Sequence, residues 1–502
     1  MKKVFSISLA LLFLSTLLSC KDSSTGSDDE IEEAPQEKQF VWEAMNYWYY
    51  WQEQVPKLSD NKSFFENEQD YHNYLMDFNH PEGVFEDLQF NKENGFSEAV
   101  LAQFGEDDFS FFIDDYKVFL AQQQGESYNF GFEYGLVGFE GETEIFGYVQ
   151  YVIPDTPAEA AGIERGDVFS HINGTRLNRN NYGNLLSSSS LELGLADYNN
   201  RVITPNGETK TVQAGDVFED PIYMSKVINT GAASVGYLLY NSFQRNSHQD
   251  LNDVFGEFKS QGIDELVLDL RYNGGGAVTT SQLLTSMISG LGSSNEFGRY
   301  SFNSKRNPLY QEVVSFLDEG PIYDSEGNLT DATFPINKLS LDRLYVLTSY
   351  RTASASESVI NSLRAYIDVI VIGDQTVGKD DISLTLFDSD VPYHEGANIN
   401  PTHNYALQPI VGKLVNRNGE SEGEGFLPDY EVIEYEYLEN LPPLGDENEP
   451  LLGTALTDIN GGIIAKTAQT QFRRKAIQFS TENNRATNGM YISPEDLKKL
   501  KK

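Results

Sequence analysis

Cysteine is almost absent from this sequence, since Cys20 is the only one among 502 residues. A single cysteine excludes a disulfide framework and a thiolate metal site. Histidine is also scarce: the chain has six, and none lies in a G-x-S-x-G or an H-E-x-x-H motif. The sequence signs of a Ser-His-Asp hydrolase and of a zinc peptidase are therefore missing, and we expect neither a metal nor another cofactor.

Basic residues are few relative to acidic ones. The chain has 36 Lys and Arg against 76 Asp and Glu, which gives a formal net charge of −40. Binding to nucleic acid or to anionic lipid headgroups needs a basic surface, so this balance argues against both partners. Beyond the first 20 residues, no apolar run approaches the roughly 18 residues of a membrane-spanning helix.

The first 20 residues have the composition of an export signal. MKK is a short basic start, VFSISLALLFLSTLL is apolar, and LLSC ends the segment at Cys20. This ending resembles the lipobox of bacterial lipoproteins, which implies that Cys20 carries a lipid and becomes the first residue of the mature chain. A plain signal peptide or a membrane anchor is the alternative.

Residues 21–39 contain seven carboxylates and almost no apolar side chains, which predicts a disordered tether. A short acidic run after a lipidated cysteine resembles the surface-export signal of Bacteroidetes lipoproteins, although a solvated spacer explains it equally well. We therefore expect a protein of the bacterial cell envelope, held at the outer membrane only by a lipid at Cys20. Whether it is periplasmic or surface-exposed stays open.

The rest of the chain divides into four regions by pattern. Residues 40–125 carry apolar residues at helical spacing, as in FVWEAMNYWYYWQEQVP, and predict a small helical domain. Residues 126–215 are rich in glycine and in short β-type runs, and predict a mainly β domain. Residues 216–455 alternate apolar strands with amphipathic helices, which predicts an α/β core with helices on both faces of its sheet. Residues 456–502 are expected to be a polar tail.

A specific motif lies inside the β-rich region: PDTPAEAAGIERGDVFSHINGTRL, residues 154–177. PAEAAG predicts a short helix that ends at Gly162, and RGD leads into a strand. The stretch resembles the PDZ domain of bacterial proteases, which implies capture of a peptide carboxyl terminus as an added strand. On this resemblance, the loop that binds the carboxylate lies near Tyr134, Gly135 and Leu136.

In the α/β region, the buried strand of VLDLRYNGGGAV runs into three glycines, Gly274 to Gly276. Glycines allow backbone N–H groups to line a cavity where side chains would obstruct it. A phosphate-binding loop needs G-x-x-x-x-G-K-[ST] or G-x-G-x-x-G, and neither is present. An oxyanion hole and a tight turn without chemistry remain as interpretations.

Three serines occur in RTASASES, where a strand is expected to meet a helix. Ser354-x-x-Glu357 fits a capping box, which needs no chemistry. A cap does not account for Lys379, which follows the strand DVIVIGD. The glycines, the serines and Lys379 all fall at the carboxyl ends of strands, where α/β proteins place active sites. Together they suit a serine–lysine hydrolase, with Ser354 and Ser356 as competing nucleophiles.

At this point the sequence resembles peptidase family S41, the C-terminal processing or tail-specific serine peptidases. The resemblance covers about residues 40–455 and includes the PDZ-like insertion. It rests on five motifs in family order, which are DLRYNGGG, SASESVINSL, VIGDQTVGK, GFLPDYEV and GDENEPLLGTAL. It implies a protease core of the crotonase-like, or ClpP-like, βαβ type.

The same resemblance assigns roles to residues. Ser354 is the nucleophile and Lys379 the general base, and the N–H groups of Ala355 and of Gly274 or Gly275 form the oxyanion hole. A free lysine has a pKa near ~10.4, so this role requires burial to lower it.

The resemblance leaves a third catalytic residue unidentified. Some family members carry an acidic residue 11 positions after the serine, where this chain has Ala365. Others carry glutamine four positions after the lysine, where this chain has Ser383. Ser383 is therefore a candidate third member.

Two functions remain open from the sequence. The first is a serine endopeptidase that cleaves unfolded proteins or peptides, with the PDZ-like domain recognising their carboxyl termini. The second is a non-enzymatic, surface-exposed peptide-binding lipoprotein with an inactive protease core.

Overall fold

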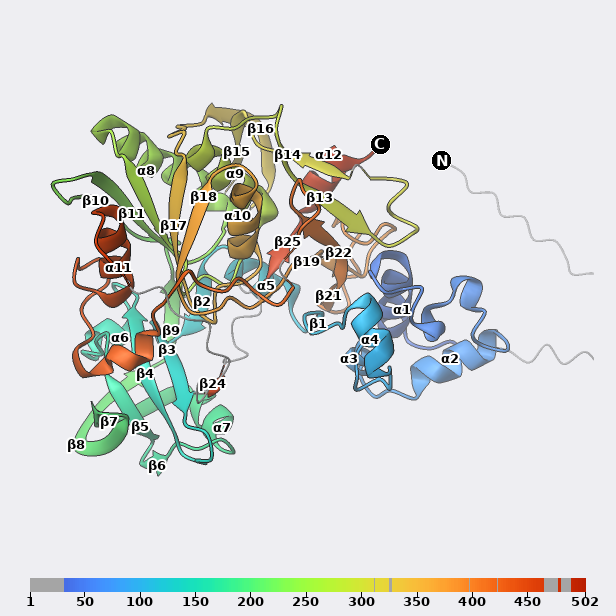
Figure 1. Ribbon diagram of the computed structural model, residues 1–502. Helices are drawn as coiled ribbons and strands as arrows, with labels where there is room; N and C mark the ends of the chain where they lie inside the picture. The colour runs from blue at the N-terminus through green and yellow to red at the C-terminus, as the bar shows by residue number, and fades with distance from the viewer. Residues whose placement is uncertain are drawn as a thin grey trace, which may run out of the picture.

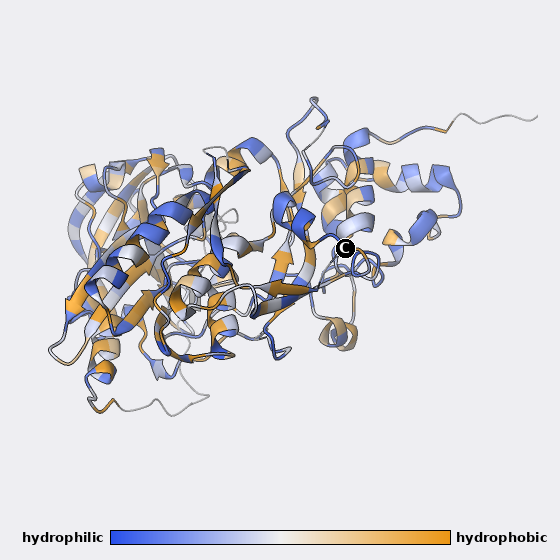
Figure 2. Ribbon diagram, turned by 90° about the horizontal axis from the view of Figure 1, so that it is seen from above, coloured by the Kyte–Doolittle hydropathy of each residue, from blue (hydrophilic) through white to orange (hydrophobic). Residues whose placement is uncertain are grey.

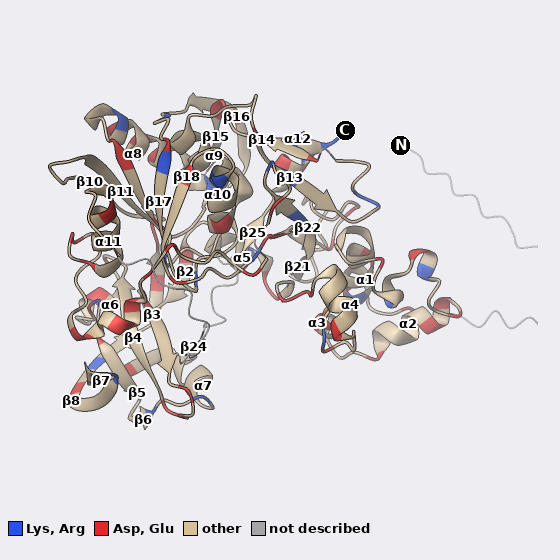
Figure 3. Cartoon of the chain, viewed as in Figure 1, with Lys and Arg blue, Asp and Glu red and all other residues tan. Residues whose placement is uncertain are grey.

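The computed structural model describes residues 31–310, 312–324, 327–396, 398–421, 423–464, 477–479 and 489–502. The predicted export signal, Cys20 and the first part of the predicted tether lie outside these residues. The described chain forms a helical N-terminal part, an α/β core and a smaller β-rich part (Figure 1). Acidic residues are distributed over all three (Figure 3). Within the described ranges, no helix is long and apolar enough to cross a membrane.

The N-terminal part is helical, as predicted. Its helices are α1 (Gln36–Trp48), α2 (Glu68–Met76), α3 (Pro81–Asp87), α4 (Glu98–Phe104) and α5 (Tyr116–Gln122), with 3-10 turns at Pro56–Leu58 and Asp60–Lys62. Helix α1 begins inside the predicted tether, so the expected boundary at residue 39 is too late. The buried apolar stripe of α1 holds this first turn in place. Just before it, the Ala34 N–H donates a hydrogen bond to His72 Nδ1 at 3.1 Å.

The core is built on a six-stranded sheet. Its strands, in sheet order, are β10 (Ile222–Asn229), β11 (Ser234–Tyr240), β12 (Glu265–Asp269), β17 (Arg343–Thr348), β18 (Asp368–Gly373) and β23 (Tyr430–Glu431). Strands β11 to β23 run parallel, and β10 is antiparallel to β11. The surrounding helices are α8 (His248–Gln261), α9 (Val278–Ser289), α10 (Ala355–Arg364) and α11 (Pro450–Ile459).

Both faces of this sheet are buried. Leu268 and Val346 belong to the same apolar cluster as the buried residues of α8, α9 and α10. Their strand neighbours Val267 and Tyr345 belong to the cluster of α11. Because successive strand residues face opposite ways, both sets must be apolar, which explains the continuous apolar runs in the sequence. The predicted α/β core is confirmed, and Figure 2 shows it from above, with hydrophobic strands between amphipathic helices.

A second sheet carries the end of the chain. In sheet order its strands are β14 (Val313–Ser315), β13 (Glu296–Phe302), β22 (Ile410–Val415), β19 (Asp381–Ser383) and β25 (Met490–Tyr491). After β25 comes helix α12 (Pro494–Leu500), with Leu497 buried in the main cluster. The predicted polar tail is therefore wrong for residues 489–502, because Met490, Ile492 and Leu497 anchor them in the core.

Smaller sheets complete this region. One joins β1 (Phe111–Ile113), β21 (Ala406–Gln408) and β20 (Leu386–Phe387), and another pairs β15 (Glu319–Tyr323) with β16 (Leu329–Pro335). The first of these attaches the N-terminal part to the core. Short 3-10 segments lie at Arg245–Ser247 and Glu434–Asn440.

The β-rich part has its own sheet and apolar core. Its strands, in sheet order, are β24 (Ile477–Phe479), β3 (Phe132–Gly138), β4 (Ile145–Val152), β5 (Val168–Ile172), β7 (Ser190–Asn199) and β8 (Val202–Gln213), with β6 (Thr175–Arg176) paired to β5. Its helices are α6 (Pro157–Ala160) and α7 (Tyr182–Leu186). Strands β2 (Glu126–Asn129) and β9 (Gly215–Phe218) pair and bring its two ends together.

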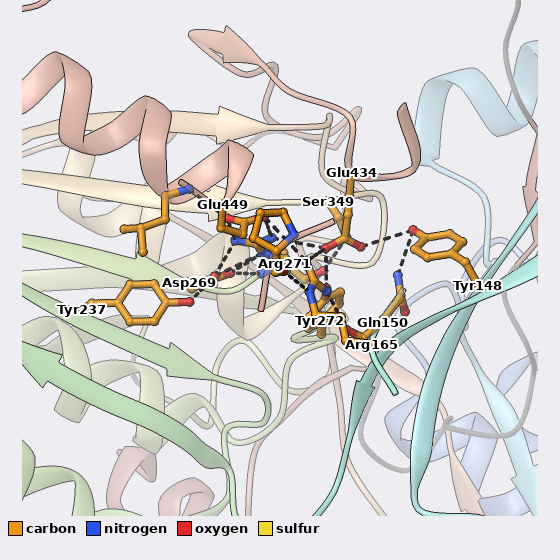
Figure 4. Close-up of polar contacts among 12 residues, drawn as sticks. Tyr148, Gln150, Arg165, Tyr237, Asp269, Arg271, Tyr272, Ser349, Glu434 and Glu449 are labelled. Carbon is orange, nitrogen blue, oxygen red and sulfur yellow. Dashed lines mark hydrogen bonds and ion pairs between the residues drawn. The ribbon is translucent and has the colours of Figure 1, made fainter. Parts of the chain in front are cut away.

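A buried charge network joins the β-rich part to the core (Figure 4). Arg271, which is 1% exposed, donates to both oxygens of Glu449 at 2.6 and 2.9 Å and to Asp269 at 2.8 and 2.9 Å. Glu434 accepts from Arg271 at 3.2 Å and from Arg165 of the β-rich part at 2.8 Å. Because Arg271 is only three residues before Gly274, the network also fixes the start of the glycine loop.

We predict that Glu449→Ala destabilises the protein by about 3–5 kcal/mol, because it leaves the Arg271 guanidinium buried with fewer partners. The free energy of unfolding in urea, followed by tryptophan fluorescence, measures this. Glu447→Ala, on an exposed neighbouring residue, is the control and is expected to change little. Equal unfolding midpoints for the two variants would contradict the prediction.

Candidate active site

Ser354 lies at the junction between the end of β17 and the first residue of α10. Its side chain is fully buried, at 0% exposure. Its backbone has φ 65° and ψ −111°, a conformation that is strained for a residue with a Cβ and that occurs preferentially at functional sites. Gly275 packs directly against it: a Cβ on Gly275 would lie 2.9 Å from the Ser354 Cβ. The turn that carries Ser354 and the glycine loop are therefore in contact.

The predicted capping box brings Ser354 and Glu357 together, and its well-defined hydrogen bond is the one that Glu357 accepts. Glu357 Oε2 accepts from the Ser354 N–H at 2.7 Å. The Ser354 hydroxyl, by contrast, makes no hydrogen bond to a described residue. A buried polar group without a partner is costly and calls for an explanation. Ser354 is thus not a simple cap, and its hydroxyl is left available to react.

Glu357 also joins this turn to the segment that carries Lys379. Its carboxylate accepts from the Thr376 hydroxyl at 2.5 Å, from the Gly378 N–H at 2.7 Å and from the Lys379 N–H at 2.8 Å. The sequence reasoning interpreted Glu357 only as a cap and so missed this role. The spacing of Ser-x-x-Glu and Thr-x-Gly-Lys was the available signal, but it does not reveal that the two segments meet.

Lys379 lies between β18 and β19 and is 5% exposed. Its Nζ makes no hydrogen bond to a described residue, and it lies 4.5 Å from the centre of the Phe109 ring. Burial lowers the pKa of Lys379 to about 8, while the carboxylates of Asp381, Asp107 and Glu357 act in the opposite direction. Phe109 and Asp107 come from the N-terminal part, so that part helps to enclose the amine. No sequence motif indicated this contribution.

Ser354 and Lys379 line the same cavity. Its other lining residues are Glu357, Ser358, Asn361, Ser362, Asp380, Leu414, Val415, Phe426 and Met490. The structure thus brings the two residues of the predicted catalytic pair to one site. The lining is mixed, with hydroxyl and amide groups from α10 facing apolar residues of the second sheet.

The three predicted oxyanion-hole donors differ in their contacts. The N–H groups of Ala355 and Gly274 make no hydrogen bond to a described residue. The Gly275 N–H donates to Asn273 Oδ1 at 2.9 Å. Of the two glycines proposed as alternatives, Gly274 is therefore the one with a free donor. Gly275 instead provides the space that the Ser354 side chain occupies, with φ at 122°.

Two other serines are occupied elsewhere. Ser356, the competing nucleophile, lies inside α10 and donates to the Asn273 carbonyl at 3.0 Å. Ser383, the candidate third member, donates to the Met490 carbonyl at 3.1 Å and accepts from Gln408 Nε2 at 2.8 Å. The structure does not bring Ser383 into hydrogen-bonding contact with Lys379.

The expected carboxylate loop is not a loop. Tyr134, Gly135 and Leu136 lie in the middle of β3 and pair with β4. Besides this backbone pairing, close packing holds the segment in the sheet: Gly135 lies so near the Tyr148 ring that an added Cβ would be 2.4 Å from it. The placement of the loop at these three residues is wrong, because they lie in a strand that pairs with β4 on one side and with β24 on the other.

Comparison with known proteins identifies the family. The model of peptidase family S41 matches residues 234–432, and that of the peptidase S41 N-terminal domain matches residues 36–111. Together they cover more than half of the chain. This chain belongs to peptidase family S41, and the family predicted from its motifs is confirmed.

Individual relatives agree with this assignment. The chain is 27% identical over 244 residues to the chloroplastic C-terminal processing peptidase of Tetradesmus obliquus, over 45% of this chain and 46% of the relative. It is 28% identical over 232 residues to a carboxyl-terminal-processing protease of Picosynechococcus sp., over 45% and 49%. The matches thus span about half the length of these curated relatives. The crystal structure of an S41 protease from Bacteroides fragilis has a TM-score of 0.59 at 25% identity, over 84% of this chain and 97% of that one.

We predict that the reactivity of Ser354 rises with pH and reaches half its maximum near pH 8. A general base must be deprotonated, and burial lowers the pKa of Lys379 to about 8, so the neutral amine predominates only above that pH. The rate at which a fluorophosphonate inactivates the protein, measured between about pH 6 and pH 10, tests this. A midpoint near the ordinary lysine value of ~10.4 would contradict it.

Proposed function

We propose that this protein is a serine endopeptidase in which Ser354 is the nucleophile and Lys379 the general base. One observation carries the proposal: a buried hydroxyl and a buried amine, neither hydrogen-bonded to a described residue, line one cavity. The segments that hold them are joined by a single carboxylate, Glu357.

The chemistry follows from these groups. Neutral Lys379 takes the hydroxyl proton as Ser354 Oγ attacks the scissile carbonyl carbon. The negative oxygen of the tetrahedral intermediate accepts from the N–H groups of Ala355 and Gly274, and such donors typically contribute roughly 3–4 kcal/mol each. The Lys379 ammonium then protonates the leaving amine. Water hydrolyses the acyl-enzyme with Lys379 again acting as base, which restores Ser354.

We predict that Ser354→Ala and Lys379→Ala each abolish cleavage of an unfolded protein such as casein, whereas Ser356→Ala, on a neighbouring serine, retains it. Cleavage is measured by gel electrophoresis and mass spectrometry, with thermal unfolding as a check on the fold. Cleavage by Ser354→Ala would contradict the proposed nucleophile. Absence of cleavage in the unaltered protein, with peptide binding retained, would favour the peptide-binding lipoprotein instead.

We also propose that the β-rich part is a PDZ domain that binds substrate carboxyl termini along the outer edge of β3. The supporting observation is that this edge already pairs with an extended segment. Residues Ile477–Phe479 form β24, which is antiparallel to β3 with Phe479 opposite Leu136 and Ile477 opposite Gly138 (Figure 1). An added strand at this position is the binding mode of PDZ domains.

The same strand is linked to the nucleophile turn. Arg351, three residues before Ser354, forms an ion pair with Glu133 of β3 at 2.7 Å and donates to Gln150 Oε1 at 2.7 Å. These side chains are largely buried, so the contact is screened less than a surface pair. A peptide that pairs with β3 is therefore held by the same strand that contacts the turn carrying Ser354.

We predict that a peptide with an apolar carboxyl terminus is cleaved with a lower KM than the same peptide with a terminal amide. The amide removes the charge that backbone N–H groups bind, and leaves the scissile region unchanged. Steady-state kinetics on the matched pair measure the difference. Equal KM values would contradict recognition of the carboxylate, without affecting the assignment of Ser354 and Lys379.

A further inference from the structure

The end of the chain lies between the two halves of the candidate site. On one side, the Gly276 N–H donates to the Gly489 carbonyl and the Tyr491 N–H donates to the Gly276 carbonyl, both at 3.1 Å. On the other side, β25 pairs in parallel with β19, and the Ile492 N–H donates to the Ser383 carbonyl at 3.1 Å. Strand β25 thus connects the glycine loop to the strand that follows Lys379.

Gly489, directly before β25, is in close contact with the catalytic amine. A Cβ built on Gly489 would lie 2.8 Å from Lys379 Nζ and 3.8 Å from Lys379 Cε, and no atom of any other described residue beyond its chain neighbours would be within 4 Å. Carbon atoms are in favourable contact at about 3.5–4.0 Å, so 2.8 Å is a clash. Any side chain at position 489 therefore competes with the Lys379 amine for the same space.

The backbone at Gly489 has little freedom to yield to such a clash. The Gly489 carbonyl already accepts from the glycine loop. The next residue, Met490, is also fixed, since it is 1% exposed and its carbonyl accepts from the Ser383 hydroxyl. Further along, the buried Leu497 of α12 anchors the segment. The Lys379 Nζ, by contrast, is the end of a flexible side chain. The amine, rather than the strand, is the group that would move.

We propose that Gly489 is a positioning residue for Lys379: its lack of a side chain leaves the space in which the amine lies beside Ser354. This inference rests on the proposed serine–lysine mechanism. It makes the C-terminal strand part of the machinery of the site, although that strand is more than a hundred residues from either catalytic residue in sequence.

The test is Gly489→Ala in the full chain. We expect kcat for peptide cleavage to fall by roughly a hundredfold, the cost of displacing a reacting group by about 1 Å. KM is expected to change by less than about twofold, because the variant touches the amine and not the peptide edge on β3. Gly183→Ala, in α7 of the β-rich part, is the control, since a Cβ there meets no atom of a described residue within 4 Å, and it is expected to retain full activity.

A double variant shows whether Gly489 acts through the lysine. In a Lys379→Ala background, Gly489→Ala is expected to cause no further loss in the residual rate of fluorophosphonate labelling, because the group it displaces is gone. An additional loss in that background would overturn the proposal. Unchanged kcat in Gly489→Ala alone would overturn it as well.

The remaining outcomes are also decisive. If Gly489→Ala fails to fold, the proposal is wrong, because it states that the lysine yields and not the backbone. Thermal unfolding detects this outcome. If Ser354→Ala and Lys379→Ala abolish cleavage but Gly489→Ala does not, only the role of Gly489 fails. If those two variants remain active, the serine–lysine mechanism itself fails.

Discussion

The buried carboxylate of Glu357 is the interaction on which the arrangement of the site depends. It accepts hydrogen bonds from the backbone at Ser354 and at Lys379, and also from Thr376 and Gly378. Burial raises the pKa of Glu357 above its ordinary value, and these hydrogen bonds offset part of the rise. A buried carboxylate is costly unless it is hydrogen-bonded in this way. Two segments from different strand ends are thereby held in register. The serine hydroxyl and the lysine amine need no direct bond to each other to be placed at one cavity.

Burial of charge recurs throughout the molecule. The amine of Lys379 is enclosed by Phe109 from the N-terminal part, and lowering its pKa from 10.5 to about 8 costs on the order of 3 kcal/mol of solvation. The fold provides this by packing Phe109 of the N-terminal part and Gly489, directly before β25, against the amine. Arg271 and Arg165, with three carboxylate partners, connect the β-rich part to the core in a similar way, and each of these buried carboxylates accepts from a guanidinium. The active site thus depends on contacts between parts that are distant in sequence.

The α/β core, and the meeting of Ser354 and Lys379 at one cavity, could be predicted because their signals in the sequence are local. Continuous apolar strands alternating with amphipathic helices define the sheet, and the motifs around Ser354 and Lys379 lie at strand ends that topology brings together. What could not be predicted depends on long-range packing. The polar composition after residue 456 concealed β25, since two buried strand residues carry too little pattern to detect. Phe109 reaches the lysine from the N-terminal part. Tyr134 was assigned to a loop on the resemblance to PDZ domains, whereas the glycine after it makes room for a ring within a strand.

The central claim is that burial keeps Lys379 neutral enough to act as a base. Its most direct test is an NMR titration of the protein labelled with carbon-13 at the lysine ε-carbon, with Lys379 assigned from the spectrum of Lys379→Arg. The account predicts that this resonance titrates with a midpoint near 8. A midpoint near ~10.4, the value of a solvent-exposed lysine, would contradict it.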